Sequence, residues 1–455
     1  MIKNECELKR FFIFNSTLGP KEGQEHERIL YYYPHDTHIE AKKMRVGLCE
    51  AIVKFMVNFS SDDCEALHTQ KTKEIFFQPE KDYWMVMTVN VPYIQKTSPD
   101  GSHYFEYHGD QVQTKVLQSI LSAAHRLFRL FMGAFADMPN DLLRLKLENF
   151  FHPYLLQLNL PHCDVLDMFQ GVQYLPLDRL SFFRVQCFVN LIEANFPAIK
   201  QTAFLYNDQL IWNGVSPSDM RVIYKYLVDT LLPAHVEREL QGGSRLSAQH
   251  YGCYVSPPGG FREPSDLARV TKVHLNYEAT VEVYYMVVYR ALAATICFFI
   301  DANSKLSLQL MRSIDTFVGP QLSSIASEIA EQCDKESSPV GNQTDLASPK
   351  YLYFNQLNLA YKSTVHLDNR HNGNIAVTPE VLKLVADIHS DRQCLEKYGE
   401  IIMKAMNDFW VIGKISNLRE FYVIIQHKNA NLKEINEEVK KMCDSKLNSI
   451  FFYPI

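Results

Sequence analysis

Short apolar runs joined by turn-forming residues recur along the chain and predict paired strands. In the stretch TAFLYNDQLIWNG (202–214), Asn207 and Asp208 separate two such runs, and both residue types tolerate the positive φ angles of a tight hairpin turn. With that turn, one face carries Ala203, Leu205, Leu210 and Trp212, and the other carries Phe204, Tyr206 and Ile211. Because a hairpin with one face in water alternates apolar and polar residues, we expect both faces of this one to be covered.

Similar pairs of apolar runs lie near both ends of the chain. RFFIFN and ERILYYYP form one pair, and DFWVIG and REFYVII form another. Each of the three pairs is followed by an amphipathic helical pattern, over residues 42–59, 217–232 and 431–443. The chain thus repeats a strand–strand–helix unit that begins near positions 10, 202 and 409. In the third helix, Asn431 and Glu434 have the spacing of a capping box.

The segments between these units predict further strands and helices. Strands are expected at EIFF, 83–89, 281–289 and 294–300, and helices over 110–135, over 141–158 and from about 305. Gly319 and Pro320 should kink or break the last of these helices. Two polar stretches, 241–266 and 334–349, have the composition of loops.

Antiparallel sheets with helices on both faces explain the doubly apolar hairpin. This α+β arrangement of α/β/α sandwiches is the simplest one that covers both faces, and we expect it three times. We place the domain boundaries near 160 and 345, which gives domains at 1–160, 161–344 and 345–455.

The helix predicted over 42–59 carries more apolar residues than packing on one sheet requires. One stripe consists of Met44, Leu48, Ile52, Phe55 and Phe59, and a second, beside it, consists of Val46, Cys49, Val53 and Met56. Together they span an arc of roughly 200°, whereas packing on a sheet needs about 100°. Either another helix of the same chain covers the extra stripe, or a partner protein docks there.

Composition and charge exclude several classes of protein. The net charge of −6 argues against a nucleic-acid-binding protein, which needs a basic surface to neutralise phosphates. The ten cysteines show no C-x-x-C spacing, which favours buried thiols in a reducing compartment over a zinc or redox motif. The N-terminus is charged, and the longest apolar stretch, 286–300, contains Arg290 and is too short to span a bilayer. We therefore expect a soluble, cytoplasmic protein.

The sequence contains no motif for common catalytic or cofactor chemistry. The patterns GxxxxGK[ST], GxSxG, HExxH and GxGxxG are all absent. His366, Asp368 and His371 are metal-ligand types close together in a polar stretch, where we expect them to be solvated. We therefore predict no catalytic residues, no bound metal and no cofactor, and this favours an interaction protein over a conventional enzyme.

Particular strings add a family resemblance. GPKEGQEHERILYYYP, VGLCEAIVKF, LHTQKTKEIFF and WMVM, followed by TAFLYNDQLIWNG, VGPQLSSIASEI, KSTVHL and NANLKEINEEVKKMC, resemble the calcium-caffeine-zinc-sensitivity (Ccz) family of vacuolar fusion proteins, in the same order. The resemblance extends over nearly the whole chain and implies three longin domains, one for each predicted unit.

The resemblance also implies a function and partners. With a Mon-family longin protein as obligate partner, such a chain forms a guanine nucleotide exchange factor for the late-endosomal Rab GTPase, in endosome maturation, lysosomal fusion and autophagy. The first longin domains of both subunits pair, and the helices beside their sheets dock the GTPase. The other domains form a scaffold, which in animals can carry a third, regulatory subunit. The complex recruits the chain from the cytoplasm to late-endosomal and lysosomal membranes.

Exchange of this kind requires no catalytic acid or base, because the factor binds the nucleotide-free GTPase better than the nucleotide-bound form. We expect the interface at Val46, Cys49, Val53 and Met56 on the helix, and at His68, Thr69, Gln70 and Lys71 near the sheet edge. A longin-type scaffold or tether that recruits a Rab without catalysing exchange is the alternative. Direct membrane anchoring by this chain is disfavoured, because no predicted helix combines a strongly basic face with a large apolar one.

Overall fold

The computed structural model describes residues 3–59, 64–98, 100, 103–240, 252–257, 259–277, 280–336, 349–366, 377–394, 398–406 and 408–446. The chain divides into two compact units, Met1–Met168 and Phe169–Ile455. Among the described residues, the first unit holds a five-stranded and a three-stranded sheet, and the second holds a six-stranded and a five-stranded sheet. The predicted boundary near 345 lies outside the described residues, and the three-domain boundaries stay a prediction.

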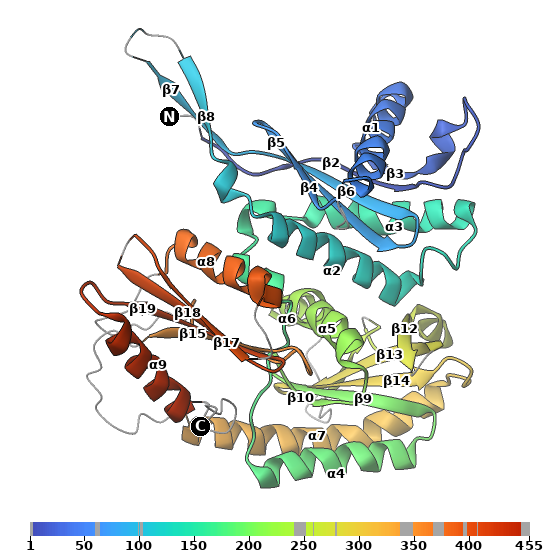
Figure 1. The fold of residues 1–455 in the computed structure, drawn as a ribbon. Coiled ribbons are helices and arrows are strands. Elements are labelled where there is room, and N and C mark those ends of the chain that lie inside the picture. Colours follow the sequence, from blue (N-terminus) through green and yellow to red (C-terminus); the bar gives the residue numbers. More distant parts are fainter. Residues whose placement is uncertain are drawn as a thin grey trace. The chain divides into compact units, whose positions relative to one another are not determined.

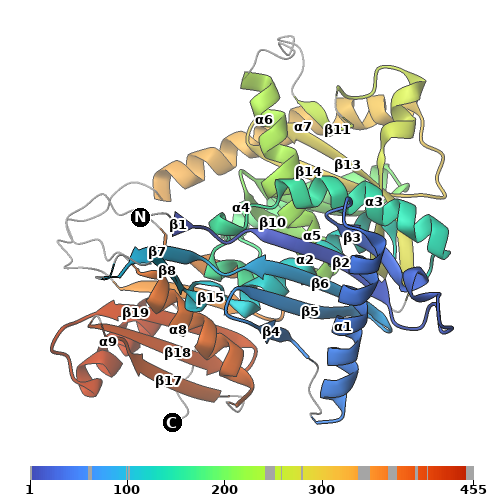
Figure 2. The ribbon, with the colours of Figure 1, turned by 90° about the horizontal axis from the view of Figure 1, so that it is seen from above.

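The main sheet of the first unit is antiparallel throughout. Its strand order is β3 (Ile29–Tyr33), β2 (Leu8–Asn15), β6 (Tyr83–Asn90), β5 (Thr72–Glu80) and β4 (Ala66–His68). Helix α1 (Ile39–Val57) covers one face, and α2 (Thr114–Met132) and α3 (Asn140–Gln157) cover the other (Figure 1). Seen from above, the strands lie side by side with α1 crossing over them (Figure 2).

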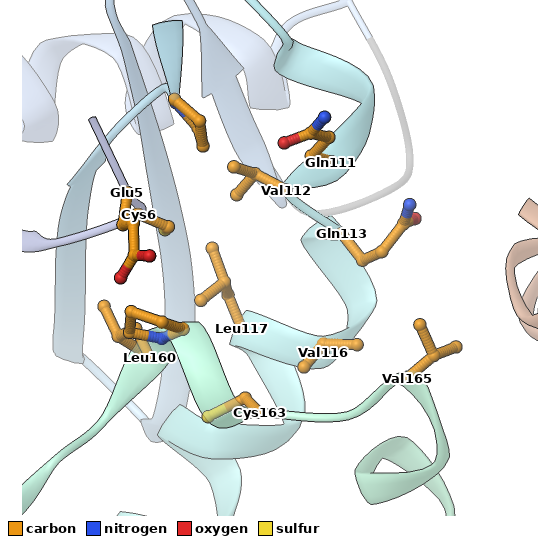
Figure 3. A pocket seen from close by; sticks show the side chains of 12 residues that line it. Glu5, Cys6, Gln111, Val112, Gln113, Val116, Leu117, Leu160, Cys163 and Val165 are labelled. Atoms are coloured by element: carbon orange, nitrogen blue, oxygen red, sulfur yellow. The ribbon is translucent and has the colours of Figure 1, made fainter. Parts of the chain in front are cut away.

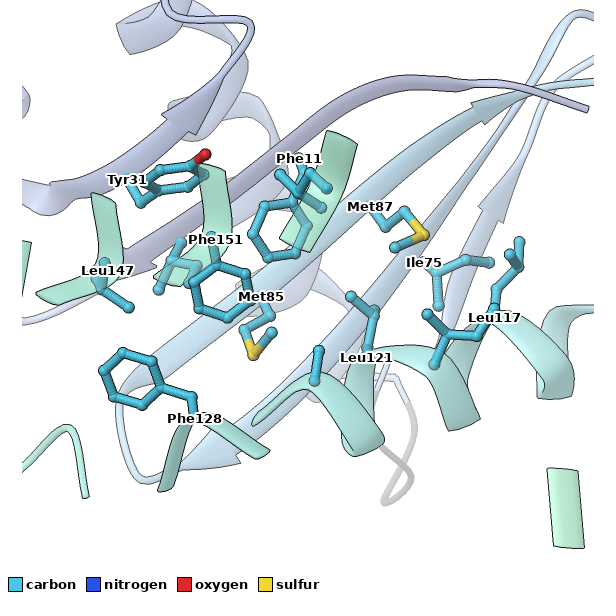
Figure 4. Packing of buried hydrophobic residues seen from close by; sticks show 14 of the residues in the cluster. Phe11, Tyr31, Ile75, Met85, Met87, Leu117, Leu121, Phe128, Leu147 and Phe151 are labelled. Carbon is cyan, nitrogen blue, oxygen red and sulfur yellow. The ribbon is translucent and has the colours of Figure 1, made fainter. Parts of the chain in front are cut away.

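Successive side chains of β2 point alternately into two hydrophobic cores, one on each face of the sheet. Phe11 faces α2 and α3, and its ring centroid is 5.0 Å from that of Phe151 (Figure 4). Phe12, the next residue, faces α1 and packs with Val46 and Cys49. The strand is therefore apolar on both faces for the reason that the sequence suggested. A small sheet of β1 (Lys3–Asn4), β7 (Tyr93–Thr97) and β8 (His103–Tyr107) accompanies the sandwich.

The six-stranded sheet of the second unit has the order β10 (Gln209–Asn213), β9 (Ile199–Tyr206), β14 (Ala294–Asp301), β13 (Thr280–Ala291) and β11 (Cys253–Ser256), with β12 (Thr271–Tyr277) also on β13. Helices α4 (Arg179–Asn195) and α7 (Leu308–Glu336) cover one face, and α5 (Pro217–Tyr226) lies against the other (Figure 1). A π-helical turn, Leu227–Leu231, links α5 to α6 (Leu232–Leu240).

The predicted hairpin at 202–214 is confirmed, with one correction. Asn207 has the expected positive φ, 49°. A bulge after Leu210 pairs Trp212 with Phe204, so Trp212 packs on the side of α4 and α7, together with Ile211. Our assignment of Trp212 to the face of Leu205 was wrong, because a bulge inserts one residue and shifts the alternation.

The third sheet has the order β16 (Tyr361–Ser363), β15 (Lys350–Asn355), β19 (Arg419–Gln426), β18 (Phe409–Ser416) and β17 (Tyr398–Lys404). Helices α8 (Pro379–Ser390) and α9 (Leu432–Lys446) lie on opposite faces. The predicted capping box begins α9: the backbone N–H of Glu434 donates to Asn431 Oδ1 and that of Asn431 donates to Glu434 Oε2, both at 3.0 Å.

All three large sheets share one topology. In each, the first strand lies between the second and the last, and a helix (α1, α5 or α8) follows the second strand. The third predicted strand–strand–helix unit was therefore assigned to the wrong strands of its sheet. It joined the last two strands, β18 and β19, to α9, whereas the equivalents of β2, β3 and α1 are β15, β16 and α8.

Two further expectations differ from the structure. Helix α7 continues through Pro320 without a break. Pro320 lacks the N–H that would bond to the Thr316 carbonyl, and the buried side chains of Val318 and Leu322 hold this part of the helix against the sheet. The predicted loops also contain regular structure, since β11 lies within 241–266 and α7 extends to Glu336.

Short 3-10 turns are found at Glu25–Arg28, Gly109–Gln111, Leu160–His162, Val165–Phe169, Pro264–Arg269 and Asp391–Cys394.

Candidate partner-docking surface

Helix α1 is fixed to the first sheet by apolar and ionic contacts. Val46, Cys49 and Val53 are buried against Phe12, Phe14, Tyr32, Phe76, Trp84 and Val86. Arg45 forms an ion pair with the buried carboxylate of Glu74 on β5. Glu50, also buried, accepts from Arg28 at 2.7 Å and from Lys54 at 2.6 Å. These contacts fix the rotation of the helix about its own axis.

The opposite side of α1 exposes a stripe of large apolar side chains. The exposed fractions are 76% for Met44, 47% for Leu48 and 60% for Phe55 on the helix, and 71% for Phe59, two residues after its end. The rings of Phe55 and Phe59 contact each other, with centroids 4.6 Å apart. A contiguous apolar surface of this kind on a helix is typical of a protein–protein contact. We call these four residues the outer stripe.

An exposed glycine of α1 lies beside the outer stripe. Gly47 is exposed in the middle of α1, and a Cβ added there would meet no atom within 4 Å. Neither a turn nor close packing inside the chain therefore requires glycine at this position. An alanine would stabilise the helix by about 0.5–1 kcal/mol. A bare backbone lets another protein approach the helix closely.

The structure places the predicted helix residues differently from our expectation. Val46, Cys49 and Val53, expected at the interface, are buried against the sheet of their own domain, and only Met56 is exposed. The other predicted stripe, apart from the half-buried Ile52, forms the outer stripe. Both stripes are apolar, so helical periodicity could not distinguish them. The position of Arg45 did indicate which side of the helix faces the sheet. Its guanidinium requires an acceptor, and the sheet supplies Glu74.

The remaining predicted residues lie at one edge of the same sheet. His68 ends the edge strand β4, and Thr69, Gln70 and Lys71 form the turn to β5. Thr69 closes this turn, because its hydroxyl donates to Thr72 O at 2.9 Å. His68 Nε2 is 3.1 Å from Thr114 Oγ1, and burial, then Lys73, lowers the pKa of His68.

A small hollow in the first unit has different chemistry (Figure 3). It lies beside the start of α2, and its lining includes Glu5 and the thiols of Cys6 and Cys163 among mainly apolar side chains. Burial raises the pKa of Cys6 to about 11, so this thiol is protonated at neutral pH and is a poor nucleophile. The hollow therefore offers apolar contacts and, at Cys6, a neutral thiol.

Within the described ranges, no helix has both the length and the apolar character needed to cross a bilayer. Of the three residues in the polar stretch HLDNRH, Asp368 and His371 lie outside the described residues.

Comparison with known proteins assigns all three repeated regions. Family models match residues 8–133 as the first longin domain of INTU, CCZ1 and HPS4, residues 199–319 as Intu longin-like domain 2, and residues 345–442 as Intu longin-like domain 3. These matches and the three sheets confirm the predicted α+β fold with three longin domains.

Full-length relatives agree with the domain matches. The chain is 42% identical to a Xenopus laevis protein over 98% of this chain and 97% of that protein, and 42% identical to a Nematostella vectensis protein over 98% of both. A Dictyostelium discoideum protein is 28% identical over 96% of both chains. Each of the three is named a vacuolar fusion protein CCZ1 homolog. The chain belongs to the CCZ1 family of three-longin-domain proteins.

Proposed function

We propose that this chain acts in vacuolar and endosomal trafficking as one subunit of a heteromeric guanine nucleotide exchange factor for the late-endosomal Rab GTPase. The observation that carries the proposal is the outer stripe of α1. Its four large apolar side chains face solvent, although the helix already buries Val46, Cys49 and Val53 on its own sheet. A second protein that covers the stripe would remove this apolar surface from water.

A Mon-family longin protein is the partner that we propose for this surface, together with the GTPase itself. The two first longin domains would place their α1 helices beside each other and form a platform for the GTPase. We assign the second and third domains to scaffolding and to a third, regulatory subunit. The assembled complex, recruited from the cytoplasm, would bring the chain to late-endosomal and lysosomal membranes.

The proposed activity rests on differential binding. An exchange factor binds the nucleotide-free GTPase more tightly than the nucleotide-bound form, and it displaces a switch segment and Mg²⁺. The residues of this chain would stabilise that open form by contact, and no proton transfer or covalent step is required of them. An apolar, rigidly anchored helix is suited to this task because it is ordered before the partner arrives.

The test measures release of a fluorescent guanine nucleotide from the late-endosomal Rab. The chain alone, the Mon-family protein alone and the co-purified pair are compared at equal concentrations. We expect only the pair to accelerate release, and we expect Phe55→Asp to abolish the acceleration. A folded pair that binds the Rab and leaves the release rate unchanged would contradict the exchange activity and support the scaffold or tether.

A further inference from the structure

Two histidines and a glutamate from distant parts of the first unit converge beside β3. His35 follows β3 and Pro34, while Glu148 and His152 lie one turn apart on α3. His35 Nε2 is 3.1 Å from His152 Nδ1 and 3.4 Å from Glu148 Oε1. One nitrogen or oxygen from each of the three side chains lies within 4.8 Å of the others. All three side chains are exposed, so ions in solution can reach them.

Two of these separations match the edges of a tetrahedral metal site. Zn²⁺ binds histidine nitrogen and carboxylate oxygen at about 2.0–2.2 Å, which places two ligand atoms of a tetrahedron about 3.4 Å apart. The two measured separations, 3.1 and 3.4 Å, are close to that value. Glu148 and His152 are four residues apart and share one side of α3, so they can chelate one ion. His35 supplies the third corner and leaves the fourth for water.

The three ligands are held by ordered parts of the fold. Leu147 and Phe151, the residues that precede Glu148 and His152, are fully buried and fix the rotation of α3 on the sheet. The carbonyl of His35 accepts a hydrogen bond from Lys42 Nζ at 2.9 Å, which fixes the loop that carries the third ligand. A metal site built in this way loses little conformational entropy when the ion binds.

A buried tyrosine supplies a second, independent observation. Tyr31 is only 3% exposed, and its hydroxyl has no hydrogen-bond partner among the described residues. Its ring meets His35 edge-on, with centroids 5.5 Å apart. Burial and then the charge of Glu148 raise the pKa of Tyr31, so the hydroxyl stays protonated near this carboxylate. A buried donor without an acceptor is costly, and the second oxygen of a carboxylate held by a metal is an acceptor that it lacks.

We propose that His35, Glu148 and His152 bind a divalent transition-metal ion, Zn²⁺ in particular, with water as the fourth ligand. Binding requires a free lone pair on both facing nitrogens, so the proton between them moves to the other nitrogen of its own ring and gives the neutral ligand tautomer. The ion joins α3 to the segment that leads into α1, since α1 begins at Ile39, four residues after His35. The proposal does not depend on the proposed exchange activity.

The test titrates metal into the full chain, alone or in complex with its partner, after treatment with a chelator. Zn²⁺ binding is followed by calorimetry, and Co²⁺, which absorbs in the visible when bound tetrahedrally, reports the geometry. We expect one equivalent to bind in the wild type. His35→Ala and the isosteric Glu148→Gln should each lower the affinity by at least about 100-fold, and Tyr31→Phe by about 10-fold.

Matched controls separate this site from other histidines. His427→Ala removes an exposed histidine outside the cluster, and the double variant His366→Ala/His371→Ala removes the pair in the polar stretch. Neither should change the affinity. Equal Zn²⁺ binding by the wild type and by His35→Ala/His152→Ala would overturn the proposal and leave a hydrogen-bonded histidine pair. Loss of binding in His366→Ala/His371→Ala alone would overturn it as well. Circular dichroism of Glu148→Gln verifies that the fold is retained.

Discussion

Arg45 on α1 forms an ion pair with Glu74, a residue of β5 that is 1% exposed. The same carboxylate accepts a hydrogen bond from the Thr88 hydroxyl at 2.8 Å. A carboxylate removed from water requires such partners, because its desolvation is not otherwise offset. The pair therefore connects the orientation of α1 to the centre of the sheet.

Removing the arginine should destabilise the first unit strongly. Arg45→Met leaves the buried carboxylate of Glu74 without its ion-pair partner, and we expect it to lower the free energy of unfolding by about 3 kcal/mol. The three tryptophans, Trp84, Trp212 and Trp410, lie in three different sheets. In a background with Trp212→Phe and Trp410→Phe, urea unfolding followed by fluorescence reports the sheet of Trp84.

A surface ion pair on the same helix provides the control. Lys43 and Glu40 pair at 2.9 Å on the exposed side, and Lys43→Ala should cost at most about 0.5 kcal/mol. The double variant Arg45→Met/Glu74→Gln should recover part of the loss, because no charge then remains buried. Equal effects of Arg45→Met and Lys43→Ala would contradict the anchoring role of Arg45.

The two stripes of α1 should respond differently to the same substitution. Phe55→Asp changes an exposed residue, so we expect it to preserve the fold and to weaken association with the Mon-family partner at least 30-fold, about 2 kcal/mol. Val53→Asp places a charge at a site that is 6% exposed, so it should unfold the domain. Co-purification together with circular dichroism distinguishes the outcomes. Unchanged association of Phe55→Asp would exclude the outer stripe as the contact.

Gly47 gives a second, gentler test of the same surface. Gly47→Leu fits the free chain, because no atom lies within 4 Å of an added Cβ, and it should not lower stability. In a close helix contact it should weaken association at least 10-fold, about 1.4 kcal/mol, because its side chain holds the partner away. Gly47→Ala, with a smaller side chain, should weaken association less. Affinity measured by biolayer interferometry compares the two variants, and equal affinities would show that no backbone approaches here.

Glu80 should make the first unit sensitive to acid. Burial raises the pKa of this carboxyl, but hydrogen bonds from His125 and from the backbone N–H groups of Phe135 and Ala136 outweigh it and hold the pKa below its ordinary value. A lowered folded-state pKa stabilises the protein above the unfolded-state value, about 4.3, and this contribution disappears as the pH falls through the folded-state pKa.

The corresponding experiment compares the wild type with Glu80→Gln. Between about pH 5 and pH 3, the urea midpoint reported by Trp84 should fall more steeply in the wild type than in the variant. Parallel pH profiles would show that Glu80 does not ionise differently in the folded and unfolded states.

Gly413 on β18 allows α8 to pack closely on the third sheet. An added Cβ would lie 2.6 Å from Cγ2 of Ile388 on α8. Gly413→Ala should therefore cost about 1–3 kcal/mol, and Ile388→Ala should cost about 2–5 kcal/mol through its cavity. The double variant should lose less than the sum, since each change accommodates the other. Fluorescence of Trp410, with Trp84→Phe and Trp212→Phe, measures the cycle, and strict additivity would rule out the contact.

Sequence patterns predicted the elements well where a single periodicity decided them. The Asn207–Asp208 turn and the Asn431–Glu434 capping box are local, so neighbouring residues determine them. The bulge after Leu210 and the continuity of α7 at Pro320 depend on tertiary packing, which the local pattern does not contain. The third repeat was predicted to begin at β18 instead of β15, because β18 and β19 are more apolar than β15 and β16.

The candidate sites show the same limit. The apolar excess of α1 was visible in the sequence, but the choice between its two stripes depends on Glu74, which comes from a different strand. His366, Asp368 and His371 are metal-ligand types close together in the sequence, where we expected them to be solvated, and we considered only such local clusters. We missed His35 and His152, which are 117 positions apart and meet only because α3 packs beside β3.

The shared strand order also determines when each domain can fold during synthesis. In each of the three large sheets the first strand, β2, β9 or β15, pairs with the strand that follows it and with the last strand of that sheet. The early hairpin can form as it leaves the ribosome, but its inner edge remains unpaired until the last strand emerges. Each domain therefore closes as a unit, in chain order, and a nascent chain halted before β6, β14 or β19 exposes an apolar strand edge to chaperones.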